Sequence, residues 1–374
     1  MIDEIEKQLK PLINGKLIYL SQYGSHLYGL NTENSDVDFR GVYIPTLDDI
    51  ILKKDKDEIN TEIELFHYGD IYELPNNLDN IPTIFREEME RVKVDVKIFS
   101  LQKFIQLCSK ADTNALDLLF SMESKNDNIE QYFYQKNRFL NEQEGEIYCP
   151  FWVILSNKNK LINTDRLESP ITYAFKQATK YGLKGKRLFY LQYVLKEANK
   201  LSFRPIAKPH LYHTVCELVN DYLSLDGEYL KTDVLDNKGK KELYLNVCGV
   251  QHQYNLELDT FIDRIEEKIS KEYTSQRTID AKDGNDWKAL SHAIRVLLEI
   301  KELLDTGNIQ FPLKDKEFLL DIKLGKVERE YIDNFFNQEL SNILERVQKN
   351  ELNWKYDEEF WNEFILKETK NENY

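Results

Sequence analysis

Alternating hydrophobic and polar residues predict a strand-rich N-terminal part of the chain. Residues 16–24, KLIYLSQYG, combine β-branched and aromatic side chains and end at a glycine, which predicts a buried strand running into a tight turn. Residues 35–41, SDVDFRG, and residues 91–99, RVKVDVKIF, alternate polar and apolar positions. A period of two residues is typical of half-buried strands, so two such strands are expected after the buried one.

The hydrophobic period becomes helical after residue 100. Residues 101–121 predict two short helices separated by a turn, and residues 286–307 predict a longer helix that begins at Asp286 and ends at Gly307. Between these helical segments, residues 226–254 contain two strand-like runs around a DNKGKK turn. This pattern indicates a β-hairpin or a small inserted sheet.

These elements predict an α+β protein of two domains. The first, residues 1–135, is expected to be a mixed sheet with flanking helices. A polar, turn-like stretch then leads into a mostly helical domain, residues 150–374, with a hairpin insertion near 226–254. A length of 374 residues suits two or three such units.

Candidate chemistry begins where the first strand ends. Gly24 and Ser25 follow this strand, and a short helical turn stopped by Gly29 comes next. With Ser25 as the cap of that turn, backbone N–H groups and the Ser25 hydroxyl would face an anion such as phosphate.

Two aspartates follow after ten residues. Asp36 and Asp38 share one face of the predicted strand with Arg40, because side chains alternate along a strand. Two neighbouring carboxylates attract a divalent cation. The alternative is a strand edge with two solvated aspartates after a Gly-Ser turn. The ordered combination of turn and carboxylates favours a functional site for nucleotide transfer.

The spacing of GS, ten residues and DxD resembles the signature of the polymerase-beta-like nucleotidyltransferase superfamily. The fuller string, with Tyr28-Gly29 and Arg40-Gly41, is similar to the RNA-repair-pathway polymerase-beta family of predicted nucleotidyltransferases. The resemblance implies a nucleotidyltransferase fold, two metal ions and a third carboxylate on a neighbouring strand.

Asp95 is the first candidate for this third carboxylate. It lies on the polar face of residues 91–99 between Lys93 and Lys97, so the pattern alone fits either a metal ligand or a solvated charge stripe. The resemblance favours the ligand. Glu62 and Glu64 compete for the role, since they also alternate with apolar residues.

Composition limits the classes of function. No apolar run approaches bilayer length and no secretory signal is recognised, so a soluble, cytoplasmic protein without membrane partners is expected. Four widely spaced cysteines indicate neither a zinc site nor a disulfide framework. The net charge of −15 argues against a protein that coats nucleic acid through bulk electrostatics.

One segment reverses this acidic balance. Residues 176–208 carry nine basic residues and one acidic residue, with aromatic residues interleaved. Such a surface suits a polynucleotide or a triphosphate, and Lys184, Lys186 and Arg187 are the candidates for an acceptor contact. The alternative is a helix pair with a solvated lysine face and a tyrosine-rich core.

A second cationic group lies on the long predicted helix. Lys288, His292 and Arg295 fall at i, i+4 and i+7 and therefore share a face, which would suit phosphates or a nucleic-acid end. A satisfied histidine beside two solvated charges is the alternative. The segment resembles the family's C-terminal helix, which favours a functional role.

The predicted function is a metal-dependent nucleotidyltransferase that transfers a nucleoside monophosphate from an NTP such as ATP to an RNA end, which includes tRNA, with release of pyrophosphate. Two Mg²⁺ or Mn²⁺ ions are expected. A protein acceptor, as in an AMPylating antitoxin, and a non-catalytic nucleotide sensor stay open as alternatives. The expected roles are metal binding by Asp36, Asp38 and Asp95, phosphate binding by Gly24 and Ser25, and charge or acceptor contacts by Arg40, Lys288, His292 and Arg295.

Overall fold

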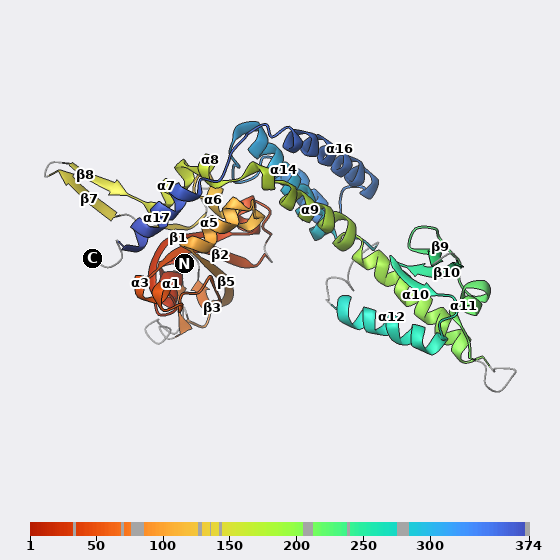
Figure 1. Cartoon of the computed structure of the whole chain (residues 1–374). Coiled ribbons are helices and arrows are strands. Elements are labelled where there is room, and N and C mark those ends of the chain that lie inside the picture. The colour runs from red at the N-terminus through yellow and green to blue at the C-terminus, as the bar shows by residue number, and fades with distance from the viewer. Residues whose placement is uncertain are drawn as a thin grey trace. The chain divides into compact units, whose positions relative to one another are not determined.

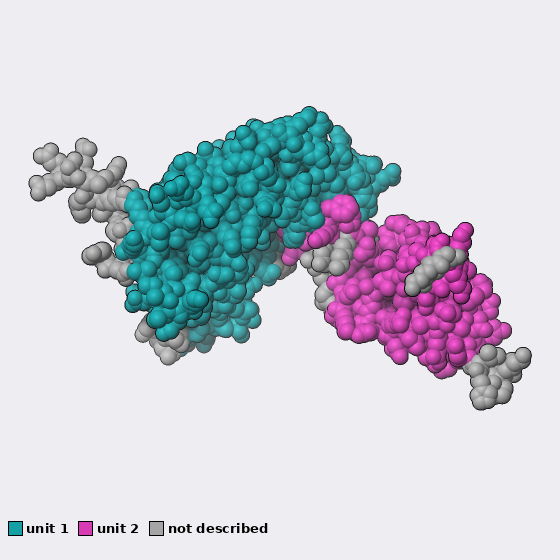
Figure 2. Space-filling view, in the orientation of Figure 1, with its two compact units in different colours: residues 1–174, 294–321, 327–374 teal, residues 175–293, 322–326 magenta. Residues whose placement is uncertain are grey.

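The structure, a computed structural model of the chain, forms two compact units (Figure 2). Unit 1 contains residues 1–174, 294–321 and 327–374, and unit 2 contains residues 175–293 and 322–326. The described residues are 1–32, 35–68, 71–75, 86–125, 129–134, 136–141, 144–204, 212–237, 240–274 and 284–370. In these ranges no helix is long and apolar enough to cross a membrane.

A six-stranded mixed sheet organises unit 1, in the order β4-β3-β5-β2-β1-β6 (Figure 1). Strands β2 and β5 are parallel, and the other neighbours are antiparallel. All three predicted strands are present: β1 was predicted from its β-branched and aromatic residues, and β2 and β5 from the alternation. The strands are β1 (Gly15–Tyr23), β2 (Val37–Pro45), β3 (Glu58–Tyr68), β4 (Ile71–Glu73), β5 (Glu90–Ser100) and β6 (Gln131–Phe133).

The apolar residues of these strands build one core. Leu20, Phe39, Val94 and Ile98 are all fully buried in it, and helix α1 (Ile2–Leu9) adds its own apolar face. The alternate positions of β2 and β5 therefore point to the other face of the sheet. This alternation places the polar residues of both strands side by side on that face.

The helices of unit 1 begin at recognisable caps. Asp112 accepts hydrogen bonds from the backbone amides of Asn114 and Ala115 at 3.0 and 3.2 Å, so it is the cap of α6. The helices before residue 175 are α1, α2 (Ser25–Tyr28), α3 (Leu47–Ile51), α5 (Leu101–Ser109), α6 (Thr113–Ser121), α7 (Pro150–Ser156) and α8 (Lys158–Leu161), with α9 (Glu168–Lys176) crossing the division. A two-stranded sheet, β7 (Lys136–Asn141) and β8 (Glu144–Tyr148), precedes α7.

The C-terminal helices return to unit 1. Asp286 Oδ1 accepts a hydrogen bond from the Ala289 amide at 3.0 Å, which confirms Asp286 as the cap of the long predicted helix. That helix, α14, crosses from unit 2 to unit 1 between residues 293 and 294. The helices of this part are α14 (Trp287–Thr306), α15 (Lys316–Lys323), α16 (Arg329–Gln348) and α17 (Glu358–Lys370).

Unit 2 packs three helices against a small sheet. Leu191 from the first helix, Leu245 from the sheet and Phe261 from the last helix are buried in its core. The hairpin predicted near residues 226–254 is a three-stranded antiparallel sheet, β11-β10-β9. The elements are α10 (Lys184–Ser202), α11 (Val215–Asp221), β9 (Leu230–Asn237), β10 (Lys240–Val247), β11 (Val250–Gln253) and α12 (Leu258–Glu272). The α+β fold class and the mostly helical C-terminal region are confirmed.

Candidate functional site

A glycine turn connects the end of β1 to the first aspartates. Gly24 has φ 66° and ψ −139°, a conformation that residues with a side chain rarely adopt. A Cβ atom on Gly24 would lie 2.5 Å from Asp38 Oδ2. Gly24 is also the cap of α2, and Ser25 is its first residue, so the prediction of Ser25 as the cap is wrong. The bare backbone is what lets the turn approach Asp38.

Strand register aligns three carboxylates. Asp38 on β2 pairs with Asp95 on β5, and Asp95 pairs with Glu62 on β3. Paired residues on adjacent strands share a face, and the strands lie about 4.8 Å apart. Asp36 is exposed and directly precedes β2. The sequence-predicted acids Asp38 and Asp95 are therefore neighbours although 57 positions separate them in the chain.

Arg40 holds the next position along this face. Its guanidinium donates to the backbone oxygens of Phe39 at 2.9 Å and Asp95 at 3.4 Å. It also lies 3.8 Å from Asp38 Oδ1 and 5.2 Å from the centre of the Tyr23 ring. The side chain is about one-fifth exposed, so part of its charge faces the space above the sheet.

A shallow pocket of about 360 Å³ opens over these strands. Its walls combine two carboxylates with two cations and neutral polar groups, which suits a charged ligand with both donors and acceptors. The lining residues are Arg40, Asn60, Thr61, Glu62, Asp95, Val96 and Lys97.

The three candidates for the third carboxylate differ in their ion pairs. Lys93 Nζ lies 2.8 Å from Glu62 Oε1, and Arg91 lies 2.7 Å from Glu64 Oε2. In the described part of the chain, no ion pair engages the Asp95 carboxylate, which is exposed. Each competing glutamate is thus occupied by a cation, whereas Asp95 is open to one.

The carboxylates suit magnesium in ligand chemistry. Mg²⁺ prefers oxygen ligands and is usually held by one or two protein carboxylates together with waters and substrate phosphates. Within the described residues, no three His, Cys, Asp or Glu side chains gather into a ready-made metal cage. Asp38 and Asp95 are adjacent in register, and Asp38 lies beside the bare turn at Gly24, so their carboxylates would suit the smaller ligand set of a nucleotide-bound ion.

Comparison with known proteins agrees with this geometry. Residues 1–71 match the model of the RNA repair pathway DNA polymerase beta family. The match spans the turn and both aspartates of the DxD pair, and it confirms the family resemblance for this part of the chain. It indicates a nucleotidyltransferase. Asp95 lies beyond the matched residues, so its assignment rests on strand register.

A phage protein is similar over nearly the full length. The chain is 28% identical over 368 residues to an uncharacterized 38.9 kDa protein of the nrdC-mobD intergenic region in Enterobacteria phage T4. The alignment covers 94% of this chain and 96% of the phage protein. The resemblance therefore includes both units, well beyond the segment that matches the polymerase beta family.

The cationic face predicted on α14 is divided between the two units. Arg295 belongs to unit 1 and is only 3% exposed. It donates to Asp117 at 3.0 Å and to Glu299 at 2.6 Å. Lys288 is exposed and His292 is half-buried, both in unit 2, and their joint role with the carboxylates stays a prediction.

The sequence did not predict a buried polar group next to the Gly24–Ser25 turn. The hydroxyl groups of Tyr23 and Tyr28 donate to Asp117 Oδ2 at 3.1 and 2.7 Å. Burial raises the pKa of both tyrosines well above the ordinary value. The available signal was Asp117 itself, a lone acid in the apolar run LDLLF of a helix.

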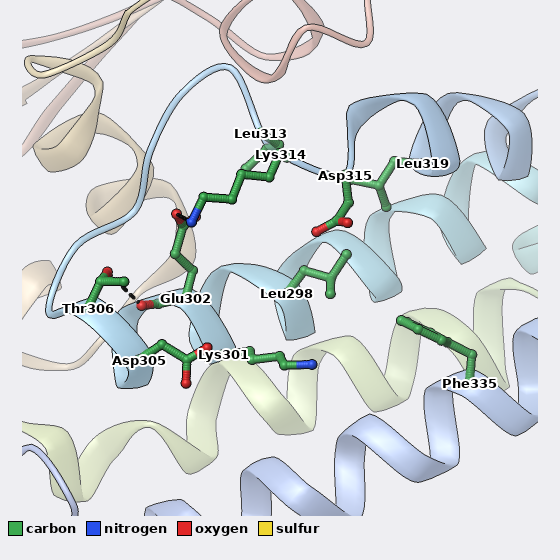
Figure 3. Close-up of a pocket in the computed structure, with 10 residues that line it drawn as sticks. All are labelled: Leu298, Lys301, Glu302, Asp305, Thr306, Leu313, Lys314, Asp315, Leu319 and Phe335. Atoms are coloured by element: carbon green, nitrogen blue, oxygen red, sulfur yellow. Dashed lines mark hydrogen bonds and ion pairs between the residues drawn. The ribbon is translucent and has the colours of Figure 1, made fainter.

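A second pocket, of about 260 Å³, lies among α14, α15 and α16 (Figure 3). Lys314 points toward Glu302 across it, and the two form an ion pair of 2.8 Å. Lys301 instead pairs with Glu339 at 2.9 Å. The charges of this pocket are therefore largely paired, either with one another or with side chains outside its lining, and it shares no residue with the carboxylate row.

The basic residues predicted on α10 differ in exposure. Lys186 is exposed, and its amine lies 5.0 Å from the centre of the Tyr229 ring. Lys184 is half-buried, with its amine 5.5 Å from the Tyr273 ring, and Arg187 is half-buried as well. Of the three predicted acceptor contacts, Lys186 therefore presents its charge most fully to solvent.

Proposed function

We propose that this protein is a metal-dependent nucleotidyltransferase that transfers a nucleoside monophosphate from an NTP to an RNA end and releases pyrophosphate. One observation carries the proposal: the bare Gly24 backbone lies against Asp38, which is paired in register with Asp95. A phosphate turn and two carboxylates on adjacent strands are what nucleotidyl transfer requires in one place.

Each residue then has a role in the reaction. The turn at Gly24 and Ser25 holds the β and γ phosphates, and Arg40 adds positive charge beside them. Bound Mg²⁺, held by Asp36, Asp38 and Asp95, would neutralise charge on the triphosphate. The acceptor hydroxyl forms a bond to the α phosphorus as the bond to the bridging oxygen breaks. Pyrophosphate leaves, and Asp95 is placed to accept the hydroxyl proton.

The acceptor surface is assigned to α10 in unit 2. Exposed residues recur every three or four positions along this helix, so Lys186, Phe189 and Lys196 share a face that ends near Phe203. Phe189 is 63% exposed and Phe203 is 86% exposed. Lysines that follow a phosphate backbone and aromatic rings that stack on bases are typical of single-strand binding. The face is basic in a chain of net charge −15, which favours a polyanion.

Label transfer tests the proposal directly. The protein is incubated with α-labelled NTPs, Mg²⁺ and RNA, and the label is followed on a denaturing gel. We expect labelled RNA with the wild type, and a loss of at least about a hundredfold in Asp38→Asn. Asp48→Asn, an exposed aspartate on α3, is the control and should retain transfer.

Other outcomes identify the alternatives. Label on a protein band in place of RNA would favour a protein acceptor. NTP binding without pyrophosphate release would favour a nucleotide sensor. Transfer that is equal in wild type and Asp38→Asn would contradict the proposed site.

A further inference from the structure

Five side chains form a buried polar cluster behind the Gly24–Ser25 turn, all of them within unit 1. Asp117, Arg295 and Glu299 are each 3% exposed or less, and both tyrosines are below 9%. The cluster joins the end of β1 to helices α2, α6 and α14. Its members are Tyr23, Tyr28, Asp117, Arg295 and Glu299.

One oxygen atom is the centre of this cluster. Asp117 Oδ2 accepts hydrogen bonds from Tyr28 at 2.7 Å, from Arg295 at 3.0 Å and from Tyr23 at 3.1 Å. A buried carboxylate is costly unless it is paired and its lone pairs are satisfied. Three donors on one oxygen satisfy it, and they fix the relative positions of the groups that donate.

Two of these donors bracket the turn. Tyr23 directly precedes Gly24, and Tyr28 is the last residue of α2, so both ends of the short segment are tied to the same oxygen. The Arg295 guanidinium lies 4.0 Å from the centre of the Tyr28 ring, a cation–π contact that holds the ring from its face. The Tyr28 carbonyl also accepts from the Leu313 amide at 3.3 Å.

We propose that Asp117, held in place by Arg295, is a positioning residue that fixes the turn in its phosphate-binding shape. This inference rests on the proposed function of the turn. Asp117 touches no reacting atom in this role. It acts through the hydroxyls of Tyr23 and Tyr28, which hold the two ends of the segment while its backbone and Ser25 face the triphosphate.

The test compares two hydroxyl deletions of the same chemical kind. Tyr28→Phe removes one bond to Asp117 and keeps the ring beneath Arg295. Tyr19→Phe removes a bond of 2.7 Å between the same strand, β1, and Ser121 on the same helix, α6. Both variants lose one buried hydrogen bond to α6, but only the first bond holds the turn. Asp117→Asn serves as a second, stronger variant.

Amide hydrogen exchange of residues 24–30 is the first measurement, because it needs no activity. We expect exchange about tenfold faster in Tyr28→Phe and unchanged in Tyr19→Phe, with similar losses in melting temperature. The second measurement is the steady-state rate of nucleotide transfer. In Tyr28→Phe the KM for NTP should rise about tenfold, while kcat changes less than about threefold.

The outcomes separate this inference from the proposed function. Unchanged exchange at residues 24–30 in both Tyr28→Phe and Asp117→Asn would overturn the positioning role. The cluster would then contribute only to the stability of the fold. Absence of transfer in the wild type would count against the proposed function, and the exchange result would still decide whether Asp117 holds the turn.

Discussion

At the scale of single residues, the candidate site depends on a glycine, which has no Cβ atom. Gly24 has a positive φ, and a Cβ atom at this position would lie 2.5 Å from Asp38 Oδ2. Two separate constraints therefore exclude other residues at this position. The backbone conformation costs about 1 to 3 kcal/mol for alanine, and the close approach forces Asp38 to move.

Gly24→Ala should lower nucleotide transfer by at least about a hundredfold, since a shift of about 1 Å in a catalytic group has an effect of this size. Gly227→Ala is the matched control. Gly227 has φ 81° and nothing within 4 Å of its Cβ position, so it experiences the backbone strain alone. Equal activity in the two variants would show that the contact with Asp38 is unimportant.

Asp95 and Glu64 allow a similar comparison on the sheet. Asp95→Asn should reduce transfer by at least about a hundredfold, because its carboxylate is open to a metal ion and to the acceptor proton. Glu64→Gln breaks only an exposed ion pair with Arg91 and should change transfer less than about threefold. The measurement is initial rate at saturating NTP. A larger loss in Glu64→Gln would assign the third carboxylate to β3.

The candidate residues that lie close together in the sequence could be predicted from it. Gly24, Ser25, Asp36 and Asp38 lie within fifteen consecutive residues, so spacing and alternation exposed them. Alternation also singled out Asp95, and the ion pairs between β3 and β5 favour it over the two glutamates as the third carboxylate. The link between Asp117 and α14 spans 178 residues, and a lone acid in an apolar helix gives no sign of its partner.

At the scale of elements, α6 and α14 meet through a buried charge network. Glu299 on α14 interacts electrostatically with Arg295 and Glu302 on its own helix, with Asp117 on α6 and with Tyr28 on α2. Burial raises the pKa of Glu299 to about 8, although Arg295 opposes the shift. The folded protein therefore keeps a proton on this carboxyl that the unfolded chain releases at lower pH.

This difference predicts a pH-dependent stability. Between about pH 4.5 and pH 8 the folded state binds more protons at Glu299 than the unfolded state, so the free energy of unfolding contributed by this group falls as pH rises. Denaturant melts at pH 5, 7 and 9 should show the loss in the wild type. In Glu299→Gln the curve should be flatter by a few kcal/mol across this range. Parallel curves would show that Glu299 is not protonated in the fold.

The elements themselves were largely predictable. Period-two alternation located β2 and β5, which bury alternate side chains in one core. β1 was located instead by its run of β-branched and aromatic residues, because it is buried on both faces. The cap of α2 was misplaced by one residue, since capping statistics favour serine while the close approach to Asp38 requires a glycine. The third strand of the inserted sheet, β11, was not resolved from the hairpin because it is four residues long.

At the scale of the whole molecule, unit 2 carries the basic helix α10 in a chain whose net charge is −15. Lys186→Glu combined with Lys196→Glu should weaken RNA binding by about tenfold or more and make the salt slope of log Kd shallower. NTP binding should not change. Fluorescence anisotropy with a labelled single-stranded RNA measures both affinity and salt dependence.

Lys241→Glu provides the control for this surface. Lys241 is an exposed lysine on β10 of the same unit. Its replacement by glutamate changes the net charge as much as either α10 substitution does, but leaves the sequence of α10 unchanged. An equal loss of affinity in Lys241→Glu would indicate a general charge effect and would count against a specific α10 surface.

Unit 1 is not continuous in the chain, since residues 294–321 join it only after residues 175–293 of unit 2. The guanidinium of Arg295 reaches Asp117 across 178 residues, which a ribosome adds in roughly 9 to 36 s. Throughout that interval the Asp117 carboxylate lacks its cationic partner, although Tyr23 and Tyr28 are already in the chain. The polar cluster next to the Gly24–Ser25 turn is thus completed only after translation of α14, and chaperones that hold a nascent chain would encounter this unit with its polar cluster still open.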